Sequence, residues 1–324
     1  MQNIPIFLAT DDYYAPFMCT TMYSVLEHTN DFIEFYVLDN KISEKSKNLT
    51  KKSLKQFKNY SVEYLDISKL GIDKLPNLGH YTANTFSRYY IPIMKPDIKK
   101  MLYLDVDIIV KRDIAELYNQ DITGYAMGAT SEDFYPDNKA CLKKYYPEYK
   151  DESDYFNAGI LVIDNQEFVK NNYAQQLLDT AIKYREFLHC PSQDVMNIVL
   201  EGKVKIIDQK FDYMPDHYEF YKNLKNQDFA DKLKESAVII HYTSGKPWYN
   251  KSCANADFWE IVNKTKFKKI ITEILNNNRK KNINRNFTFW QKIFSVTNQS
   301  GKNDKKYKVF TILGIKLKFQ MKER

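Results

Sequence analysis

The chain has 324 residues, of which 44% are hydrophobic and 15% aromatic, so it can bury a large core and is not a disordered protein. Its net charge of +7 is divided unevenly: residues 264–324 carry 17 Lys and Arg against 3 Asp and Glu, which leaves 31 basic and 38 acidic residues in 1–263. No apolar run reaches the ~20 residues that cross a bilayer, and the first ten residues lack the features of a secretory signal. We therefore expect a cytoplasmic protein with a globular domain over residues 1–262 and a basic tail over 263–324.

Strands and helices alternate along the chain, which predicts an α/β fold with parallel strands joined by right-handed crossovers. The expected strands are 4–10, 35–38, 62–67, 101–110, 125–129, 156–164, 204–207, 211–214 and 237–240. The expected helices are 16–28, 43–57 with Ser43 as its cap, 85–90, 114–118, 166–188, one that Ser192 caps, and 257–275. Residues 131–155 are expected to form a long loop, and 276–286 a linker.

The run Met101–Val110 is the most informative stretch. Eight of its ten residues are apolar or aromatic, which is typical of a strand buried on both faces, yet it contains Asp105 and Asp107 and no Lys or Arg. Buried carboxylates need a partner, and side chains two apart on a strand project to one face, so both could address one cation. The alternative is that one Asp begins a loop and the other caps a helix.

Several common motifs are absent. No Gly-rich dinucleotide fingerprint or phosphate-binding loop follows the first strand, which argues against a dehydrogenase or a P-loop enzyme. The four cysteines, Cys19, Cys141, Cys190 and Cys253, are widely spaced, so we expect free thiols.

Two loops carry polar residues suited to a nucleotide. Asp11-Asp12-Tyr13-Tyr14 follows the first strand and could hold a nucleoside by hydrogen bonding and stacking, or Asp11 or Asp12 could cap the next helix. His241 ends the last apolar run, where a neutral imidazole suits Mn²⁺ beside two carboxylates, and Lys246 follows as a charge for phosphate. A structural, hydrogen-bonded histidine is the alternative.

These residues, taken in order, resemble the retaining glycosyltransferases of family 8, which include bacterial lipooligosaccharide galactosyl- and glucosyltransferases and the glycogenins. The resemblance covers about residues 4–260. It rests on Ala9-Thr10-Asp11-Asp12-Tyr13-Tyr14, Phe86-Ser87-Arg88, Tyr103-Leu104-Asp105-Val106-Asp107, Phe156-Asn157-Ala158-Gly159, Gln193-Asp194 and His241…Lys246-Pro247-Trp248. It implies a GT-A fold, in which a mixed, mostly parallel sheet binds a nucleotide sugar.

The resemblance also implies roles for the matching residues. Asp105, Asp107 and His241 would bind a divalent cation, Mn²⁺ or alternatively Mg²⁺, that bridges the diphosphate of a UDP-sugar. Lys246 would neutralise the departing diphosphate. The other residues expected at the donor site are Ala9, Asp11 and Tyr14 at uridine, Arg88, Asn157, Ala158 and Gln193 at the sugar, and Val106 and Gly245.

The catalytic candidates are Gln193, Asp194 and Lys246. A metal and a lysine at the leaving phosphate stabilise the transition state of sugar transfer. Retention by double displacement would need a carboxylate nucleophile, but the motif residue at the anomeric carbon is Gln193, so the family is thought to use front-face attack, with Asp194 as the remaining candidate.

The sequence departs from the family in two ways. Ser192 replaces an acid that many relatives place before the Gln-Asp pair, which leaves the donor sugar open. One residue fewer separates His241 from Lys246, so the phosphate loop could close differently.

The acceptor is expected to meet two other stretches. Residues 131–155 and 211–221 are rich in Tyr and Asp, and the candidate acceptor contacts are Tyr135, Tyr213, Tyr218, Tyr221, Asp133, Asp137 and Asp216.

The basic tail is interpreted as a peripheral anchor for an anionic membrane. Its lysines would attract lipid headgroups while apolar side chains enter the interface, namely Phe287, Phe289, Trp290, Ile293 and Phe294. A solvated helix face or a small hairpin is the alternative. No nucleic-acid motif accompanies the basic residues.

The sequence thus predicts a metal-dependent retaining glycosyltransferase that moves a hexose, with galactose or glucose favoured, from a UDP-sugar to a glycan acceptor in lipopolysaccharide or lipooligosaccharide synthesis. It would work in the cytoplasm at the inner face of the cell membrane. The alternatives are a sugar-phosphate nucleotidyltransferase and a non-catalytic glycan- or polyanion-binding module.

Overall fold

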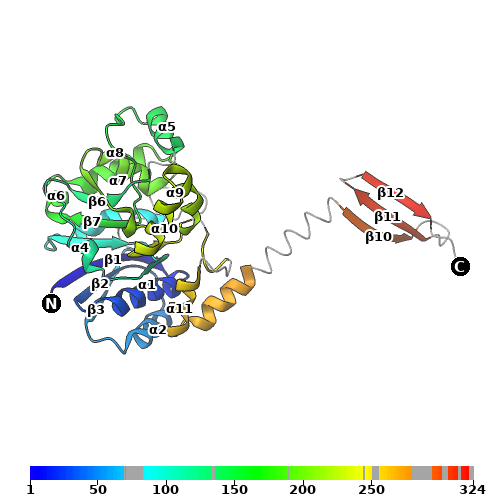
Figure 1. Cartoon of the computed structure of the whole chain (residues 1–324), viewed down its shortest axis with the longest axis horizontal. Helices are drawn as coiled ribbons and strands as arrows, with labels where there is room; N and C mark the ends of the chain where they lie inside the picture. The colour runs from blue at the N-terminus through cyan, green and yellow to red at the C-terminus, as the bar shows by residue number, and fades with distance from the viewer. Residues whose placement is uncertain are drawn as a thin grey trace. The chain divides into compact units, whose positions relative to one another are not determined.

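A seven-stranded sheet occupies the centre of the chain's larger unit in this computed structural model (Figure 1). The structure describes residues 1–68, 70, 83–132, 136–188, 190–243, 245–249 and 255–278, and the backbone of strands at 294–300, 306–312 and 315–320. By their contacts, residues 1–247 and 252–269 form one unit, and residues 248–251 and 270–324 form a second.

The sheet is mixed and mostly parallel, as the sequence predicts. Its order is β3-β2-β1-β4-β7-β6-β8; β3, β2, β1 and β4 are parallel, β7 is antiparallel to both β4 and β6, and β6 is parallel to β8. The strands are β1 (Asn3–Asp11), β2 (Phe32–Asn40), β3 (Tyr60–Asp66), β4 (Lys100–Leu104), β6 (Met127–Thr130), β7 (Ile160–Asp164) and β8 (Val204–Ile207). A separate pair, β5 (Ile108–Val110) and β9 (Ile239–His241), is antiparallel.

Helices cover both faces of the sheet. The helix α1 (Ala15–His28), with α2 (Glu44–Leu54) and α11 (Ala256–Lys264), lies on one side, and α6 (Asn165–Lys170), α7 (Tyr173–Lys183) and α8 (Pro191–Val199) lie on the other (Figure 1). The remaining helical segments are the 3₁₀ helix η2 (Ala83–Tyr90), α3 (Ile91–Met94), α4 (Ala115–Tyr118), α5 (Pro136–Tyr145), the 3₁₀ turns η3 (Gln209–Phe211) and η4 (Pro215–His217), α9 (Tyr218–Leu224) and α10 (Gln227–Ser236).

The expected continuous strand over 101–110 is wrong. It is two strands, β4 and β5, which belong to different sheets, and the acidic residues Asp105 and Asp107 lie in the break between them. In the break both carboxylates line the cavity, where Arg88 pairs with Asp105 and Lys246 with Asp107. The structure supports only the part of the alternative in which a carboxylate begins a loop, and it also brings both carboxylates to one candidate cation site with His241.

Other predictions of local structure are corrected. The expected helix 166–188 is divided between α6 and α7, because Asn172 adopts a left-handed conformation with φ of 53°, which asparagine tolerates. Ser192 lies inside α8, whose cap is Cys190. The expected loop 131–155 contains α5. The expected strand 211–214 forms a single bridge, Tyr213 to Ile240.

Ser43 does cap α2, as predicted, by accepting a hydrogen bond of 3.2 Å from the backbone nitrogen of Ser46. Cys19, Cys141 and Cys190 are free thiols, as expected, while Cys253 lies outside the described residues.

The second unit contains a three-stranded antiparallel sheet. Its strands are β10 (Phe294–Ser300), β11 (Lys306–Ile312) and β12 (Ile315–Gln320), in that order. The predicted linker is helical over its first residues, 276–278, and residues 279–286 lie outside the described part, as do Phe287, Phe289, Trp290 and Ile293. Among the described residues, no helix has the length and apolar character needed to cross a bilayer.

Candidate active site

A cavity of about 540 Å³ opens at the carboxyl ends of β1 and β4 in the first unit. Residues that the sequence analysis singled out make up much of its lining, namely Ala9, Asp11, Tyr14, Arg88, Asp105, Val106, Asp107, Asn157, Ala158, Gln193, His241 and Lys246. Binding in a crevice at the carboxyl ends of strands is the general behaviour of open α/β sheets.

Three of these residues form a candidate cation site. Asp105, Asp107 and His241 each offer one ligand atom, and these atoms lie within 4.8 Å of one another. Nε2 of His241 is 3.4 Å from Oδ1 of Asp107. Two carboxylates and an imidazole are a donor set that suits Mn²⁺ and similar divalent ions, so the residues present fit the expected cation.

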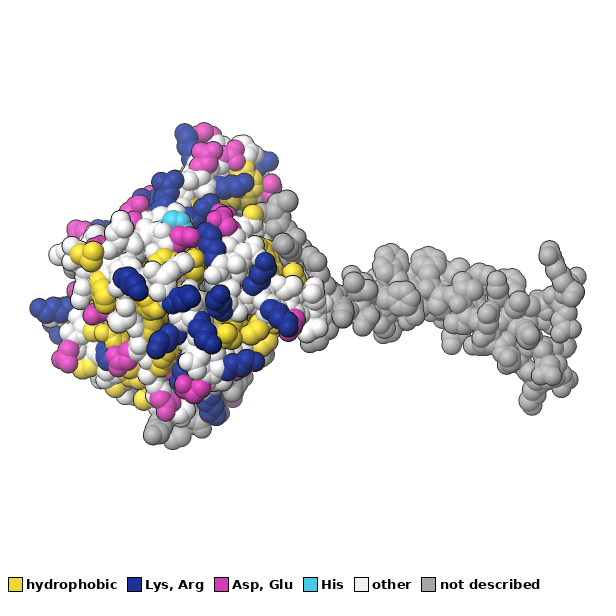
Figure 2. Space-filling model, turned by 90° about the horizontal axis from the view of Figure 1, so that it is seen from below, with side chains coloured by type: hydrophobic (Ala, Val, Ile, Leu, Met, Phe, Trp, Pro, Cys, Tyr) yellow, Lys and Arg dark blue, Asp and Glu magenta, His cyan; other side chains and the backbone are white. Residues whose placement is uncertain are grey.

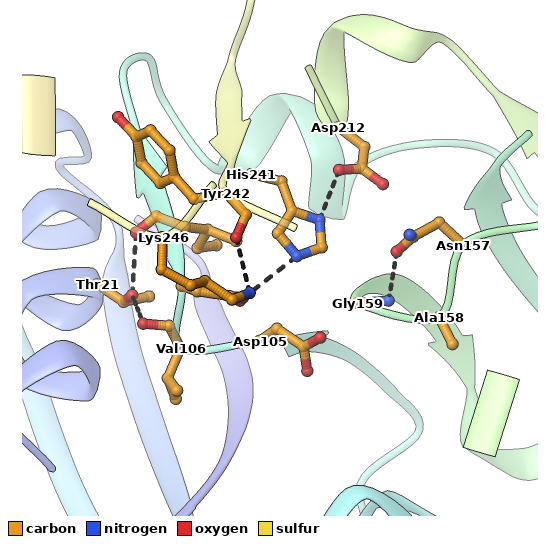
Figure 3. Close-up of polar contacts among 12 residues, drawn as sticks. Thr21, Asp105, Val106, Asn157, Ala158, Gly159, Asp212, His241, Tyr242 and Lys246 are labelled. Carbon is orange, nitrogen blue, oxygen red and sulfur yellow. Dashed lines mark hydrogen bonds and ion pairs between the residues drawn. The ribbon is translucent and has the colours of Figure 1, made fainter. Parts of the chain in front are cut away.

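The sheet pairings bring these residues together from distant parts of the sequence. Asp105 directly follows β4, and its backbone nitrogen donates a hydrogen bond to the carbonyl oxygen of Gly159 at 2.7 Å. In the β5–β9 pair, Ile108 lies directly opposite His241, and this register places the imidazole beside Asp107. Thr21 of α1 donates to the carbonyl oxygens of both Val106 and Ile108, at 3.1 and 3.0 Å, and fixes the break between β4 and β5 (Figure 3).

His241 is held from behind by Asp212. Its Nδ1 lies 2.8 Å from Oδ1 of Asp212, which is fully buried and also accepts a hydrogen bond of 2.9 Å from Thr130 (Figure 3). Burial alone would lower the pKa of His241, but the carboxylates of Asp212 and Asp107 outweigh it and raise that pKa to about 10. Hydrogen bonding at Nδ1 leaves Nε2 as the nitrogen that faces Asp107.

Each acidic residue of the cluster also has a basic partner. Arg88 lies 3.1 Å from Oδ1 of Asp105, and its second amino group donates to the carbonyl oxygen of Ala158. Lys246 pairs with Asp107 and donates to the carbonyl oxygen of Tyr242 at 2.7 Å. Burial opposes ionisation of both carboxyls, yet Lys246 and His241 hold the pKa of Asp107 below its ordinary value.

Gly159 is required by close packing at this cluster. A Cβ atom at this position would lie 2.5 Å from Cε1 of His241 and 2.8 Å from Oδ2 of Asp105. The side chain of Asn157 accepts a hydrogen bond of 2.7 Å from the Gly159 nitrogen and so stabilises the turn. The Phe156–Gly159 motif therefore brings backbone close to the cation site.

A second polar network surrounds Gln193. Its Oε1 accepts a hydrogen bond of 3.0 Å from the Ala158 nitrogen, and its Nε2 donates to Glu132 at 2.6 Å. Glu132 also accepts from Asn157 at 3.3 Å. Burial and the neighbouring Asp212 raise the pKa of Glu132 to about 7. The amide of Gln193 is thus held at both ends beside a carboxyl group that lines the cavity.

The two acidic residues of the first loop make different contacts. Asp11 lines the cavity and also accepts a hydrogen bond of 3.0 Å from the backbone nitrogen of Tyr14 at the start of α1. Asp12 instead points to α2, where it accepts hydrogen bonds from the nitrogen and hydroxyl of Ser43 at 2.9 and 2.8 Å. Tyr14 also lines the cavity, and its stacking on a base stays a prediction.

Two predicted site residues are not in the cavity lining. Asp194 accepts hydrogen bonds from the hydroxyl of Tyr155 at 2.7 Å and from the nitrogen of Cys190 at 2.9 Å, so it secures the start of α8. The backbone nitrogen of Gly245 donates a hydrogen bond to the side chain of Asp216. Their catalytic and donor-binding roles stay predictions.

Of the expected acceptor residues, those that the structure describes, Tyr213, Asp216, Tyr218 and Tyr221, are not in the cavity lining. Tyr213 and Tyr221 are buried, and the hydroxyl of Tyr218 donates to Asp231. The side chains of Tyr135, Asp133 and Asp137 lie outside the described part of the chain.

Sequence reasoning missed Asp212 and Glu132. Each lies in a short stretch that has no recognisable motif, and each reaches the site only through tertiary packing. Asp212 does follow a buried apolar residue, Phe211, and Glu132 lies two residues after the end of the buried strand β6, so an acid close behind a buried segment was the available signal.

Comparisons with known proteins agree with this geometry. The model of the family named "Glycosyl transferase family 8" matches residues 5–252. A putative glycosyltransferase of Haemophilus influenzae is 28% identical over 255 residues, which cover 78% of this chain and 75% of that protein. The lipopolysaccharide 1,2-glucosyltransferase of Escherichia coli is 26% identical over 193 residues, 59% of this chain and 54% of its own length.

Among solved structures, the galactosyltransferase LgtC, crystallised with donor and acceptor sugar analogues, superposes with a TM-score of 0.69 and 24% identity, over 81% of this chain and 96% of that one. This likeness confirms the GT-A fold. The family match spans well over half of the sequence, and the chain belongs to glycosyl transferase family 8.

Proposed function

We propose that this glycosyltransferase moves a hexose, galactose or glucose in preference, from a UDP-sugar to a glycan acceptor with retention of configuration, and that it requires Mn²⁺. The observation that carries the proposal is the cluster of Asp105, Asp107 and His241 within 4.8 Å, with Lys246 against Asp107 at the carboxyl ends of the strands. A cation held there would supply positive charge for the diphosphate leaving group.

The chain's own residues divide the remaining work. Tyr14 and Asp11, at the end of β1, would hold uridine, with the tyrosine ring stacked on the base. Lys246 would neutralise phosphate oxygens, since its ammonium group already lies at the cation site. Arg88 is fixed by Asp105 and by the carbonyl oxygen of Ala158, so it presents a rigid charge to the donor.

The surroundings of Gln193 favour attack on the face from which the leaving group departs. An amide stands where a double displacement would need a carboxylate, and both ends of the amide are engaged by Ala158 and Glu132. Asp194, the other candidate nucleophile, bonds Tyr155 and the backbone of Cys190. On this proposal the departing phosphate accepts the proton of the acceptor hydroxyl.

We place the reaction in lipopolysaccharide or lipooligosaccharide synthesis at the inner face of the cell membrane. The matching Escherichia coli protein is a lipopolysaccharide glucosyltransferase, which supports the class of acceptor. The excess of lysine and arginine over residues 264–324 supports attraction of the tail to anionic lipid. Replacing Lys306, Lys308, Lys316 and Lys318 by Gln in the full chain should weaken binding to phosphatidylglycerol vesicles.

A donor screen tests the activity. The purified chain is incubated with UDP-galactose, UDP-glucose or UDP-N-acetylhexosamines, with Mn²⁺ or with a chelator, and release of UDP is measured. We expect turnover of one hexose donor with Mn²⁺, and loss of Mn²⁺-dependent UDP binding in Asp107→Asn but not in the exposed control Asp228→Asn. Failure of every UDP-sugar, or release of pyrophosphate from UTP and a sugar phosphate, would overturn the proposal.

A further inference from the structure

The larger unit carries a surface built from lysines of two separate segments, which we call the lysine face. Lys266 donates its backbone nitrogen to the Ser53 hydroxyl at 2.9 Å, so the segment that follows α11 lies against α2. Figure 2 shows Lys and Arg side chains gathered on the side seen from below, the side on which α2 lies in Figure 1. The lysine face consists of the exposed residues Lys51, Lys52, Lys55, Lys266 and Lys269.

Local electrostatics account for only part of this arrangement. Lys51 and Lys52 lie in the last turn of α2, where the helix dipole favours a cation. A further helical stretch begins at Lys268, and Lys266 and Lys269 lie at its N-terminal end. The positive end of a helix dipole disfavours a cation at such a position. Lys51 and Lys55 also repel each other at i,i+4. The lysines are therefore gathered on one face against local repulsion.

Neighbouring acids do not neutralise the face. Two lysines beside the face form ion pairs. Lys47 lies 2.8 Å from Asp39, and Lys264 lies 2.7 Å from Glu27. Among the described residues, the five lysines of the face take part in no ion pair. Residues 1–269, which include the whole face, carry 35 Lys and Arg against 38 Asp and Glu, so the uncompensated positive charge of this face is a local feature and not a property of the whole surface.

The composition of the face favours a lipid surface over nucleic acid. It contains lysines and no arginine, and lysine acts as a hydrated point charge that suits the diffuse charge of lipid headgroups, whereas bidentate recognition of bases and phosphates uses arginine. The exposed residues between the lysines are polar, such as Asn48, Gln56 and Asn263, and offer no ring for base stacking.

We propose that the lysine face docks the catalytic unit on an anionic bilayer, as a contact separate from the basic tail. The inference rests on the proposed membrane location, but not on the donor sugar. Two weak electrostatic contacts on one chain bind together far more tightly than either alone. The face would then fix how the unit rests on the surface from which a lipid-linked acceptor is taken.

The test is vesicle binding by the full chain without any UDP-sugar. Lys51→Gln, Lys52→Gln and Lys55→Gln are combined, because glutamine keeps the helix propensity of lysine and removes only the charge. Binding to sucrose-loaded phosphatidylcholine vesicles with phosphatidylglycerol is measured by co-sedimentation. We expect about a fivefold loss of affinity for each lysine, or on the order of 100-fold for the triple variant, and the loss should shrink at high salt. Lys266→Gln with Lys269→Gln should act in the same direction.

The control removes three charges elsewhere. The control combines Lys225→Gln, Lys232→Gln and Lys234→Gln. These lysines are exposed and lie in or next to α10, and the control lowers the net charge by the same amount as the triple face variant. Equal losses of vesicle affinity in the control and in the face variant would overturn the proposal. So would unchanged vesicle binding by the face variant, if the tail variant by itself abolishes binding. The proposal would also be overturned if the face variant lost binding to a single-stranded oligonucleotide but kept its affinity for vesicles. Because no sugar donor is present, none of these outcomes depends on the transferase activity.

Discussion

Asp212 lies 2.8 Å from Nδ1 of His241, and its carboxylate is fully buried. A carboxylate at Nδ1 fixes the orientation of the imidazole ring and directs Nε2 at the cation site. Partners of this kind commonly raise the affinity of a metal site although they do not touch the metal. Asp212 is therefore a positioning residue.

Asp212→Asn should weaken Mn²⁺ binding by about 10- to 100-fold. The amide can still accept from Nδ1, but it supplies no charge to the imidazole and is free to present its NH₂ group instead. The hydrogen bond from Thr130 to Asp212 is weakened as well, so some loss of stability is expected. Isothermal titration with Mn²⁺, together with UDP, measures the affinity.

Circular dichroism would check that the Asp212→Asn variant is folded, and Asp228→Asn on the exposed face of α10 serves as the matched control. An unchanged Mn²⁺ affinity in a folded Asp212 variant would show that the carboxylate does not position His241.

The sequence was sufficient to place most strands along the chain and to group the three residues of the candidate cation site. The predicted bounds of β1 and α1 agree with the structure to within one residue, whereas β2 extends over Phe32–Asn40, well beyond the expected 35–38. Asp105, Asp107 and His241 were identified as a group from motifs, but the predicted geometry was wrong. They converge through a break between β4 and β5 and the pairing of β5 with β9, which depends on contacts far apart in sequence.

The features that could not be predicted depend mostly on tertiary contacts between residues far apart in the sequence. Glu132 and Asp212 have no motif of their own, and their roles arise from hydrogen bonds to Gln193 and His241 across 61 and 29 residues of sequence. The division of α6 from α7 depends on the backbone of Asn172, which propensity does not distinguish from a helical asparagine.

Gly159→Ala should disrupt the cation site. The added Cβ would lie 2.5 Å from Cε1 of His241 and 2.8 Å from Asp105, so one of the two ligands must move. We expect at least a tenfold loss of Mn²⁺ affinity by titration, because metal ligands tolerate little displacement.

Gly128→Ala is the matched control for Gly159→Ala. Its Cβ would lie 2.9 Å from Cγ2 of Ile122, inside the core and away from the cation site. Both variants should lose stability in urea, but only the Gly159 variant should lose Mn²⁺ binding. Similar Mn²⁺ affinities would contradict the close approach described here.

Arg88→Lys should lower the free energy of unfolding by about 2 kcal/mol, since a lysine loses at least one charged hydrogen bond. Arg88 uses three nitrogens at once, to Thr85, Ala158 and Asp105, and its guanidinium lies 4.3 Å from the ring centroid of Tyr103. An ammonium group cannot reproduce this planar arrangement. Urea denaturation measures the change.

Arg112→Lys is the comparison for Arg88, because Arg112 is exposed and donates to a single carbonyl oxygen, that of Glu235, at 3.0 Å. Its effect should stay within about 0.5 kcal/mol. Equal effects of the two substitutions would mean that the contacts of Arg88 add nothing to folding.

The pH dependence of stability should contain a contribution from Glu132. Burial raises its pKa from 4.5 to about 7, so the folded chain holds a proton that the unfolded chain has already released between these values. The stability that this residue contributes is fully present below about pH 4.5 and is lost as the pH rises through 7. At 1.36 kcal/mol for each pKa unit, the loss is roughly 3 kcal/mol.

Glu132→Gln cannot titrate and should remove that slope. Urea unfolding at about pH 5 and pH 8 gives the comparison: the wild type should lose stability relative to the variant as the pH rises, while exposed Glu235→Gln should follow the wild type at both values. The amide of glutamine can still accept from Gln193 or Asn157, so the site is expected to remain folded. Parallel profiles for wild type and Glu132→Gln would show that Glu132 is ionised in both states throughout, and that burial is not setting its pKa.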